Sequence, residues 1–188
     1  DVCSSDLRSL FLIFVLISSG AYASGLKIEI TGDGANGVVT IDLFEETAPL
    51  HAERIITLAR EGAYNGVVFH RVIDGFMAQT GDVEFGKIGE DIAMAGRGGS
   101  ALPDLPAEFS DLPYDRGVVG MARSQNPDSA NSQFFIMFAE GYFLNGQYTV
   151  VGKVTSGMDI VDTVKRGKGQ NGAVLGKPDM MNKVTTTP

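Results

Sequence analysis

Short segments typical of β-strands, separated by glycine-rich turns, are the feature that most constrains what this sequence can fold into. The 188 residues include 24 glycines and only 20% charged residues, as expected for many short strands and tight turns. Alternating or continuously apolar runs predict strands at 26–30, 38–44, 67–73, 76–80, 117–123, 132–138, 148–154 and 180–186. No internal repeat or linker interrupts the series, so the sequence predicts one mainly β domain over residues 24–188.

Two segments show the periodicity of helices instead. In TAPLHAERIITLAREG, Thr47 is a candidate N-cap, Pro49 suits the first turn and Gly62 is placed to end the helix. The segment GMDIVDTVKRG predicts a second helix over 157–167. Residues 83–114 have no clear period and predict loops with one short strand near 91–95. Eight strands and two isolated helices favour a closed or nearly closed eight-stranded antiparallel β-barrel capped by the helices.

The first 23 residues predict a signal peptide ahead of this domain. The apolar run 10–17 is too short to span a membrane, which takes about 20 residues. Small residues follow at Ala21 and Ala23, so we expect cleavage after Ala23 and no stable membrane insertion afterwards. A retained anchor is the alternative. The opening DVCSSDL, residues 1–7, resembles a translated sequencing adapter, and we interpret it as an assembly artefact.

Composition argues against several classes of function. The net charge of −8 argues against nucleic acid or an anionic membrane as the main partner. The only cysteine, Cys3, lies within residues 1–7, so the domain itself has no thiol for a disulfide, a zinc site or a nucleophile. We therefore expect no metal and no cofactor. The two histidines, His51 and His70, are isolated from each other in the sequence, and we interpret them as structural or solvated.

Several strands combine polar groups with large apolar side chains on one face. Alternation along a strand groups Gln133 with Phe135 and Met137, Gln79 with Met77, and Arg71 with Phe69 and Ile73. The opposite face of strand 132–138 is entirely apolar and suits a barrel interior. The mixed faces predict a shallow groove that binds an apolar group and hydrogen-bonds its neighbours.

Three blocks of the sequence resemble the cyclophilin-type peptidyl-prolyl isomerases. They are FHRVIDGFMAQTGD at 69–82, MARSQNPDSANSQFFI at 121–136 and FLNGQYTVVGKV at 143–154, in the family's order. The likeness covers residues 26–186. It implies an eight-stranded antiparallel barrel capped by two helices, and an enzyme that accelerates rotation about X–Pro peptide bonds. The partners implied are proline-containing peptides and unfolded or folding proteins, and we expect a monomer.

The resemblance also implies roles for individual residues. It makes Arg71 the catalytic arginine and places Gln79 and Phe135 with it. The remaining matches would bind substrate: Phe76, Met77 and Leu144 as walls of a proline pocket, Gln133 as a hydrogen-bonding partner of the peptide backbone, Ala122, Arg123 and Ser124 as the strip along which the peptide lies, and Phe143 and Tyr148 at the same site.

Rotation about an amide explains why these motifs contain no nucleophile or base. The barrier of about 18–20 kcal/mol reflects lost conjugation, and no bond is broken. In the twisted state the prolyl nitrogen becomes pyramidal and can accept a hydrogen bond. A guanidinium aimed at that nitrogen would stabilise the twisted state and not the planar one, which is the requirement for catalysis.

Three positions depart from common versions of the family pattern. Phe143 stands where many eukaryotic members have tryptophan, and Tyr148 where many have histidine; both departures resemble bacterial members. Without the indole N–H we expect weak binding of cyclosporin-type macrocycles. Asp74 lies in a turn where proline is common, and its effect is left open.

Two other classes of function are alternatives to the enzyme. A proline-binding module or holdase chaperone could share the fold, but it could lose Arg71 without penalty. A small hydrolase would need a Ser/His/Asp arrangement, and the sequence shows none. We expect an isomerase that acts on exported proteins in a bacterial periplasm.

Overall fold

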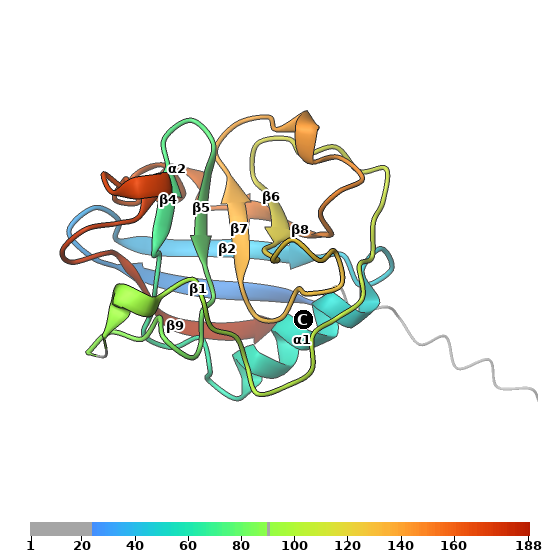
Figure 1. Cartoon of the computed structure of the whole chain (residues 1–188), viewed down its shortest axis with the longest axis horizontal. Coiled ribbons are helices and arrows are strands. Elements are labelled where there is room, and N and C mark those ends of the chain that lie inside the picture. The colour runs from blue at the N-terminus through green and yellow to red at the C-terminus, as the bar shows by residue number, and fades with distance from the viewer. Residues whose placement is uncertain (1–23, 90) are drawn as a thin grey trace, which may run out of the picture.

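Nine strands form a single antiparallel, strongly curled sheet in residues 24–89 and 91–188, which the computed structural model describes (Figure 1). The strands are β1 (Gly25–Thr31), β2 (Gly37–Leu43), β3 (Val67–Val68), β4 (Arg71–Ile73), β5 (Met77–Thr80), β6 (Val118–Met121), β7 (Phe134–Met137), β8 (Val150–Ser156) and β9 (Met180–Thr187). Their order across the sheet is β3-β9-β1-β2-β8-β6-β7-β5-β4. The predicted signal peptide, residues 1–23, lies outside the described residues.

The prediction of a closed eight-stranded barrel is wrong, because the sheet is open between β3 and β4. The run 67–73, predicted as one strand, divides at Phe69 and His70: β3 pairs with β9 and β4 pairs with β5. Only two residues separate these edge strands, yet within the described residues no hydrogen-bond ladder joins them. The division also breaks the alternation, so Phe69 enters the interior core and does not share a face with Arg71.

The outer edge of β4 is covered by a loop instead of a strand. The Gly167 N–H donates to the carbonyl of Val72 at 2.8 Å, and the Val174 N–H donates to the carbonyl of His70 at 2.9 Å. Between them lies the short 3₁₀ helix η3 (Gln170–Gly172). This covering satisfies an edge that would otherwise expose backbone groups, and it places the loop 167–174 beside Arg71.

Two α-helices accompany the sheet, as predicted, but their bounds differ. Helix α1 (Pro49–Arg60) packs against β9 and β1, and its N-cap is Ala48 rather than Thr47. The carboxylate of Glu108 accepts hydrogen bonds from the first backbone N–H groups of α1, those of Leu50 and His51. This distant carboxylate replaces the expected Thr47 cap.

Helix α2 (Met158–Asp162) contacts β2 and is shorter than the predicted helix 157–167. The chain turns after it, so that the Lys165 N–H donates to the buried carboxylate of Asp179 at 2.7 Å. The strand expected near 91–95 is the 3₁₀ helix η1 (Ile92–Met94), and a further one, η2 (Tyr142–Leu144), precedes β8. No helix in the described part of the chain has the length and apolar character to cross a membrane.

Strand β7 separates two apolar clusters. Phe134 and Ile136 face the interior of the curled sheet and join the main core. Phe135 and Met137 face outward and join a smaller cluster with Met77. This alternation was predicted for strand 132–138. Burying side chains of this size contributes about 1.5–3 kcal/mol each, so the outer cluster is a stable base for a site on that face.

Candidate active site

Neighbouring strands place a row of residues across the outer face of the sheet. Arg71 of β4 pairs with Gln79 of β5, and Gln79 pairs with Phe135 of β7. Residues directly opposite in antiparallel strands point to the same face, so the three side chains are neighbours. Next in the row is Gly120 of β6, where a Cβ atom would lie 2.5 Å from the Phe135 ring. Glycine here leaves the space that Phe135 occupies.

A mainly apolar pocket of about 260 Å³ lies beside this row. Met77 and Phe135 form buried parts of its wall, whereas Phe143 at its rim is 66% exposed. Its lining residues are Arg71, Phe76, Met77, Gln79, Ala122, Arg123, Phe135, Phe143, Leu144 and Tyr148. All of them were named from the sequence motifs, and the structure brings them together. Their individual roles stay predictions.

Aromatic contacts hold the walls of this pocket in place. The Phe135 ring is stacked on Tyr114 with centroids 5.8 Å apart and meets Tyr148 edge-on at 6.0 Å. At the rim, the rings of Phe76 and Phe143 lie 5.5 Å apart. Such pairs contribute about 0.5–1.5 kcal/mol beyond the area they bury. The walls of the pocket are therefore held by contacts within the protein.

Arg123 contributes to the pocket through its side chain as well as its backbone. Its guanidinium lies 4.3 Å from the centre of the Tyr148 ring, a cation–π contact. The same group donates to the carbonyl of Gln147 at 2.8 Å. Arg123 thus ties the segment that follows β6 to the segment that carries Tyr148, across the mouth of the pocket.

Arg71 is half-buried and is held by two oxygen acceptors, with a longer contact from its Nη1 to Sδ of Met77 at 3.9 Å. Its Nη1 donates to Oε1 of Gln79 at 3.0 Å, and its Nε donates to the backbone carbonyl of Asn171 at 2.9 Å. Partial burial lowers the pKa of the Arg71 guanidinium, but an arginine remains charged at neutral pH. Arg71 forms no ion pair within the described residues. Its charge and its remaining N–H groups are available at the pocket.

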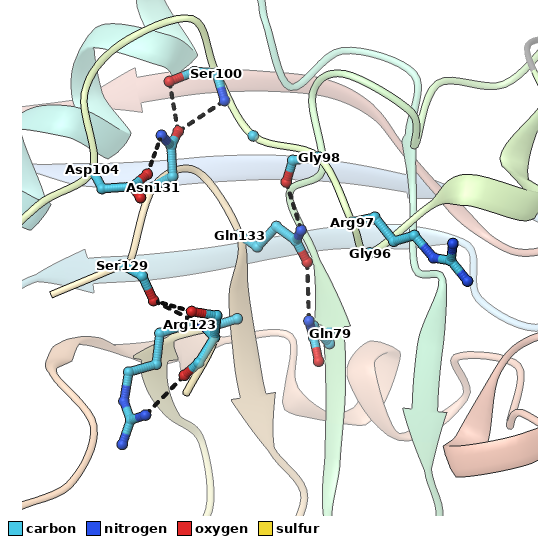
Figure 2. A pocket seen from close by; sticks show the side chains of 13 residues that line it. Gln79, Gly96, Arg97, Gly98, Ser100, Asp104, Arg123, Ser129, Asn131 and Gln133 are labelled. Atoms are coloured by element: carbon cyan, nitrogen blue, oxygen red, sulfur yellow. Dashed lines mark hydrogen bonds between the residues drawn. The ribbon is translucent and has the colours of Figure 1, made fainter. Parts of the chain in front are cut away.

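A relay of amides continues from Arg71 into a second pocket. Nε2 of Gln79 donates to Oε1 of Gln133 at 3.0 Å, and Nε2 of Gln133 donates to the carbonyl of Gly98 at 2.8 Å (Figure 2). Oε1 of Gln79 already accepts from Arg71. The side chain of Gln79 therefore positions Arg71 and Gln133, in addition to any contact it makes with substrate.

The second pocket is larger, about 510 Å³, and polar (Figure 2). It shares Gln79, Ala122 and Arg123 with the apolar pocket. Two predicted site residues that the apolar pocket lacks, Ser124 and Gln133, line this one. The other lining residues are Gly96, Arg97, Gly98, Gly99, Ser100, Asp104, Ser129 and Asn131.

Sequence reasoning missed most of this polar pocket. Asn131 anchors it: its Oδ1 accepts from the backbone N–H of Ser100 at 2.8 Å, and its Nδ2 donates to Asp104 at 2.9 Å. These partners lie in a loop segment without periodicity, so no spacing pattern links them to Asn131. Of the polar loop SQNPDSAN, 124–131, the family resemblance named only Ser124, and no pattern in the sequence pointed to Ser129 or Asn131.

Neither histidine lines the two pockets. His51 is fully buried in α1 with its Nδ1 2.6 Å from the carboxylate of Glu108. Burial lowers the pKa of His70 to about 4, against the opposing effect of the Asp82 carboxylate. In the part of the chain that the structure describes, no cluster of three or more His, Cys, Asp or Glu side chains is arranged to hold a metal ion.

Comparison with known proteins identifies the family. A family model described as cyclophilin type peptidyl-prolyl cis-trans isomerase/CLD matches residues 26–186. The chain belongs to the cyclophilin family. It is a peptidyl-prolyl cis–trans isomerase, as its motifs implied.

Relatives and solved structures agree with this assignment. A probable peptidyl-prolyl cis-trans isomerase of Brucella suis is 64% identical over 153 residues, covering 80% of this chain and 78% of the relative. The corresponding enzyme of Acinetobacter baylyi is 37% identical over 155 residues, covering 80% and 77%. Among structures, a cyclophilin from Cryptosporidium parvum has a TM-score of 0.73 at 24% identity, covering 89% of this chain and 99% of its own, and supports the fold alone. A cyclophilin from Hirschia baltica has a TM-score of 0.68 at 26% identity, covering 86% and 73%.

Proposed function

We propose that this cyclophilin accelerates X–Pro isomerisation in exported proteins as they fold, with Arg71 as its catalytic residue. The observation that carries the proposal is the position of the Arg71 guanidinium. It lies at the wall of the apolar pocket, held by Gln79 and Asn171. Among the described residues, the only other cation that lines this pocket is Arg123, whose guanidinium lies over the Tyr148 ring at the mouth.

Catalysis would follow from holding one side of the amide while the other turns. The prolyl ring enters the apolar pocket against Phe135, Met77 and Leu144 and is fixed there. The carbonyl before the proline rotates, and the prolyl nitrogen becomes pyramidal. An N–H of Arg71 then donates to that nitrogen, an interaction that the planar amide cannot make. A hydrogen bond to a charged group contributes about 1.5–3 kcal/mol, or roughly tenfold to a hundredfold in rate.

The remaining predicted residues would bind the peptide on either side of the proline. Ala122, Arg123 and Ser124 lead from the apolar pocket into the polar one, so a peptide lying along them would reach both. The side-chain amide of Gln133 donates to Gly98 through one N–H, and its second N–H would meet the peptide backbone. A structure of the Cryptosporidium parvum cyclophilin was determined in the presence of the dipeptide Ala-Pro, which supports proline-containing peptides as ligands here.

The cellular setting is part of the proposal. The apolar run 10–17 and the small residues before Ser24 support export, with the bacterial periplasm as the destination. The clients would be unfolded or folding exported proteins, bound by a monomer. The acidic net charge supports protein partners over nucleic acid.

The central test compares wild type with Arg71→Ala in an assay of X–Pro peptide isomerisation. We expect kcat/KM to fall at least about tenfold, equivalent to about 1.4 kcal/mol of transition-state stabilisation. Arg60→Ala is the matched control, because Arg60 is exposed at the end of α1 and lines neither of the two pockets. If the wild type binds peptides without accelerating isomerisation, a proline-binding module or holdase is the better description.

Export has its own test. The full chain would be expressed in a bacterium with a periplasm, and the N-terminus of the periplasmic protein sequenced. We expect it to begin at Ser24. Protein that stays in the cytoplasm, or in the membrane with residues 10–17 attached, would contradict the proposal of a cleaved signal.

A further inference from the structure

Asn171 has a backbone conformation that side-chain-bearing residues rarely adopt. Its φ of 55° and ψ of 26° lie in the left-handed region, and it is the one non-glycine residue with positive φ in the described part of the chain. Asn tolerates this region better than most residues but still less readily than Gly. Strained backbone of this kind persists where the surroundings hold it in place, and it concentrates at functional sites.

The strained residue directs its carbonyl at Arg71. The carbonyl oxygen of Asn171 accepts a hydrogen bond from Nε of Arg71 at 2.9 Å. Arg71 therefore has oxygen acceptors at two different nitrogens of its planar guanidinium, Asn171 at Nε and Gln79 at Nη1. Because the guanidinium is planar, holding two of its nitrogens fixes its plane. The remaining N–H groups then point in a defined direction at the pocket.

Close contacts hold the backbone around Asn171 against β4. Gly172 follows it with a φ of 80°, and a Cβ there would overlap the side chain of Ile73. On the other side of the loop, a Cβ at Gly167 would overlap the carbonyl of Gly172. With the backbone hydrogen bonds from Gly167 to Val72 and from Val174 to His70, these contacts restrict the backbone that carries the Asn171 carbonyl.

The side chain of Asn171 takes no part in these contacts. It is exposed, and within the described residues it forms no hydrogen bond; the carbonyl alone is used. The identity of residue 171 therefore matters through the backbone conformation it permits. Gly keeps that conformation available, whereas a β-branched residue disfavours it strongly.

We propose that Asn171 is a positioning residue for isomerisation: its left-handed backbone aims a carbonyl at Nε of Arg71 and sets the plane of the guanidinium that faces the prolyl nitrogen. The inference rests on the proposed catalytic role of Arg71. Asn171 itself does not touch the substrate, so its effect passes entirely through Arg71.

The test is a double-mutant cycle with a conservative rescue. Asn171→Val and Asn171→Gly are made in the wild type and in Arg71→Ala, and kcat, KM and the melting temperature are measured for each. In the wild type, Asn171→Val should lower kcat by about tenfold with KM little changed, because a misaimed catalytic group loses transition-state stabilisation. Asn171→Gly should recover kcat to within about twofold of wild type.

The Arg71→Ala background separates positioning from general damage. There, Asn171→Val should lower kcat by less than about twofold, since the group it positions is gone. A full tenfold loss in that background would show a structural effect and overturn the inference. A direct readout is the Nε–H resonance of Arg71 by NMR, which should shift or broaden in Asn171→Val and return in Asn171→Gly.

The outcomes also distinguish this inference from the proposed function. If Arg71→Ala is impaired but Asn171→Val has wild-type kcat, the positioning role is wrong and Arg71 remains catalytic. If Arg71→Ala retains full activity, the catalytic assignment fails and the positioning role fails with it.

Discussion

The two pockets that meet at Gln79, Ala122 and Arg123 are built in opposite ways. The apolar pocket is made of side chains anchored on β5, β7 and η2, with Met77 and Phe135 almost fully buried. The polar pocket is made largely of loop residues joined by hydrogen bonds across long sequence separations (Figure 2). Packing fixes the first as a shape that suits a ring. The second offers donors and acceptors that substitutions in loops can change without disturbing the sheet.

This difference suggests a division of labour. On this hypothesis, rotation about the X–Pro bond, which is the same step in every substrate, takes place in the apolar pocket beside Arg71. The polar pocket would bind the residues that flank the proline and would therefore discriminate among peptides. The relay from Arg71 through Gln79 and Gln133 to Gly98 joins the two, so the division can be tested by perturbing each side separately.

The largest effect is expected from Phe135→Ala, which removes the floor of the apolar pocket. Phe135 is 5% exposed and contacts two aromatic rings. We expect a loss of about 3–5 kcal/mol in the free energy of unfolding, measured by urea denaturation. In protein that remains folded, kcat/KM should fall at least about tenfold for every X–Pro peptide.

Phe134 is the matched control because it lies on the same strand and faces the main core. Phe134→Leu and Phe135→Leu should destabilise the protein to a similar extent, by about 1–2 kcal/mol. Only the change at Phe135 should lower activity beyond what the folded fraction explains. Equal activities in the two leucine variants would mean that the apolar pocket does not hold the prolyl ring.

Strand β7 also shows how far the sequence alone can lead. Its alternation divided Phe134 from Phe135 correctly, because successive side chains of a regular strand point to opposite faces. The lining of the apolar pocket was named by the resemblance to the family and not by this alternation. Closure of the barrel could not be predicted in this way. The run 67–73 contains no turn residue that would divide it, and its pattern does not show that Val67 pairs with β9 while Arg71 pairs with β5.

Hydrogen bonds made by loop residues were the second feature that the sequence did not predict. The cap of α1 comes from Glu108, 58 residues from Leu50 in the sequence, and Asn131 anchors Ser100 across 31 residues. Hydrogen bonds of this kind leave no periodic trace in the sequence. The carbonyl of Asn171 has the same character, since its direction depends on backbone angles set by tertiary packing.

The next largest effect is expected from pH, through the buried His70 that lies next to the polar pocket. His70 packs beneath Gly96, where a Cβ would lie 3.0 Å from its ring, and burial lowers its pKa to about 4. The unfolded state has a pKa near 6.5, so between pH 6.5 and 4 it binds more protons than the folded state. Stability should therefore fall as pH drops through this window, by up to about 3 kcal/mol.

The measurement is urea unfolding at pH 7 and pH 4.5 for wild type and His70→Gln. Carboxylates contribute in both proteins, so the difference between the two slopes isolates His70. The wild type should lose more stability on acidification than His70→Gln. Parallel slopes would mean that His70 is accessible to protons in the folded protein, and is therefore less buried next to the polar pocket than its contacts indicate.

A smaller and more selective effect is expected from Asn131→Ala. The change removes the amide that joins Ser100 and Asp104, and it should reduce stability by about 1–2 kcal/mol. Isomerisation of the dipeptide Ala-Pro should be almost unaffected, because it would fill only the apolar pocket. For longer peptides KM should rise about threefold with kcat unchanged. Asn36→Ala, in the β1–β2 turn, is the control, and a loss of kcat with all peptides would refute the division of labour.

The smallest effect is expected at Asp74, whose role the sequence left open. Asp74 accepts a hydrogen bond from Nε of Arg166 at 2.8 Å, which lowers the pKa of the carboxyl, and Arg166 in turn lies over the ring of Phe138. This ties the β4–β5 turn to the segment after α2. The pair is exposed, so its contribution should be small, should weaken in salt, and should be lost as pH falls through the depressed pKa of Asp74.

Replacement of Asp74 by proline removes the ion pair with Arg166, which lowers stability, and restricts the unfolded chain, which raises stability. The turn has a hydrogen bond from the Phe76 N–H to the Ile73 carbonyl, negative φ at Asp74 and a φ of 67° at Gly75. These features fit a type II turn, in which proline is favoured at the Asp74 position. Asp74→Ala should lower the melting temperature slightly, whereas Asp74→Pro should recover it by restricting the unfolded chain.

Activity should change little in either variant. The turn leads to Phe76, and the Phe76 ring is also held by Phe143. Both variants should therefore keep kcat/KM within about twofold of wild type. A larger loss in Asp74→Pro alone would mean that the turn must move during isomerisation, and that the apolar pocket is less rigid than its packing indicates.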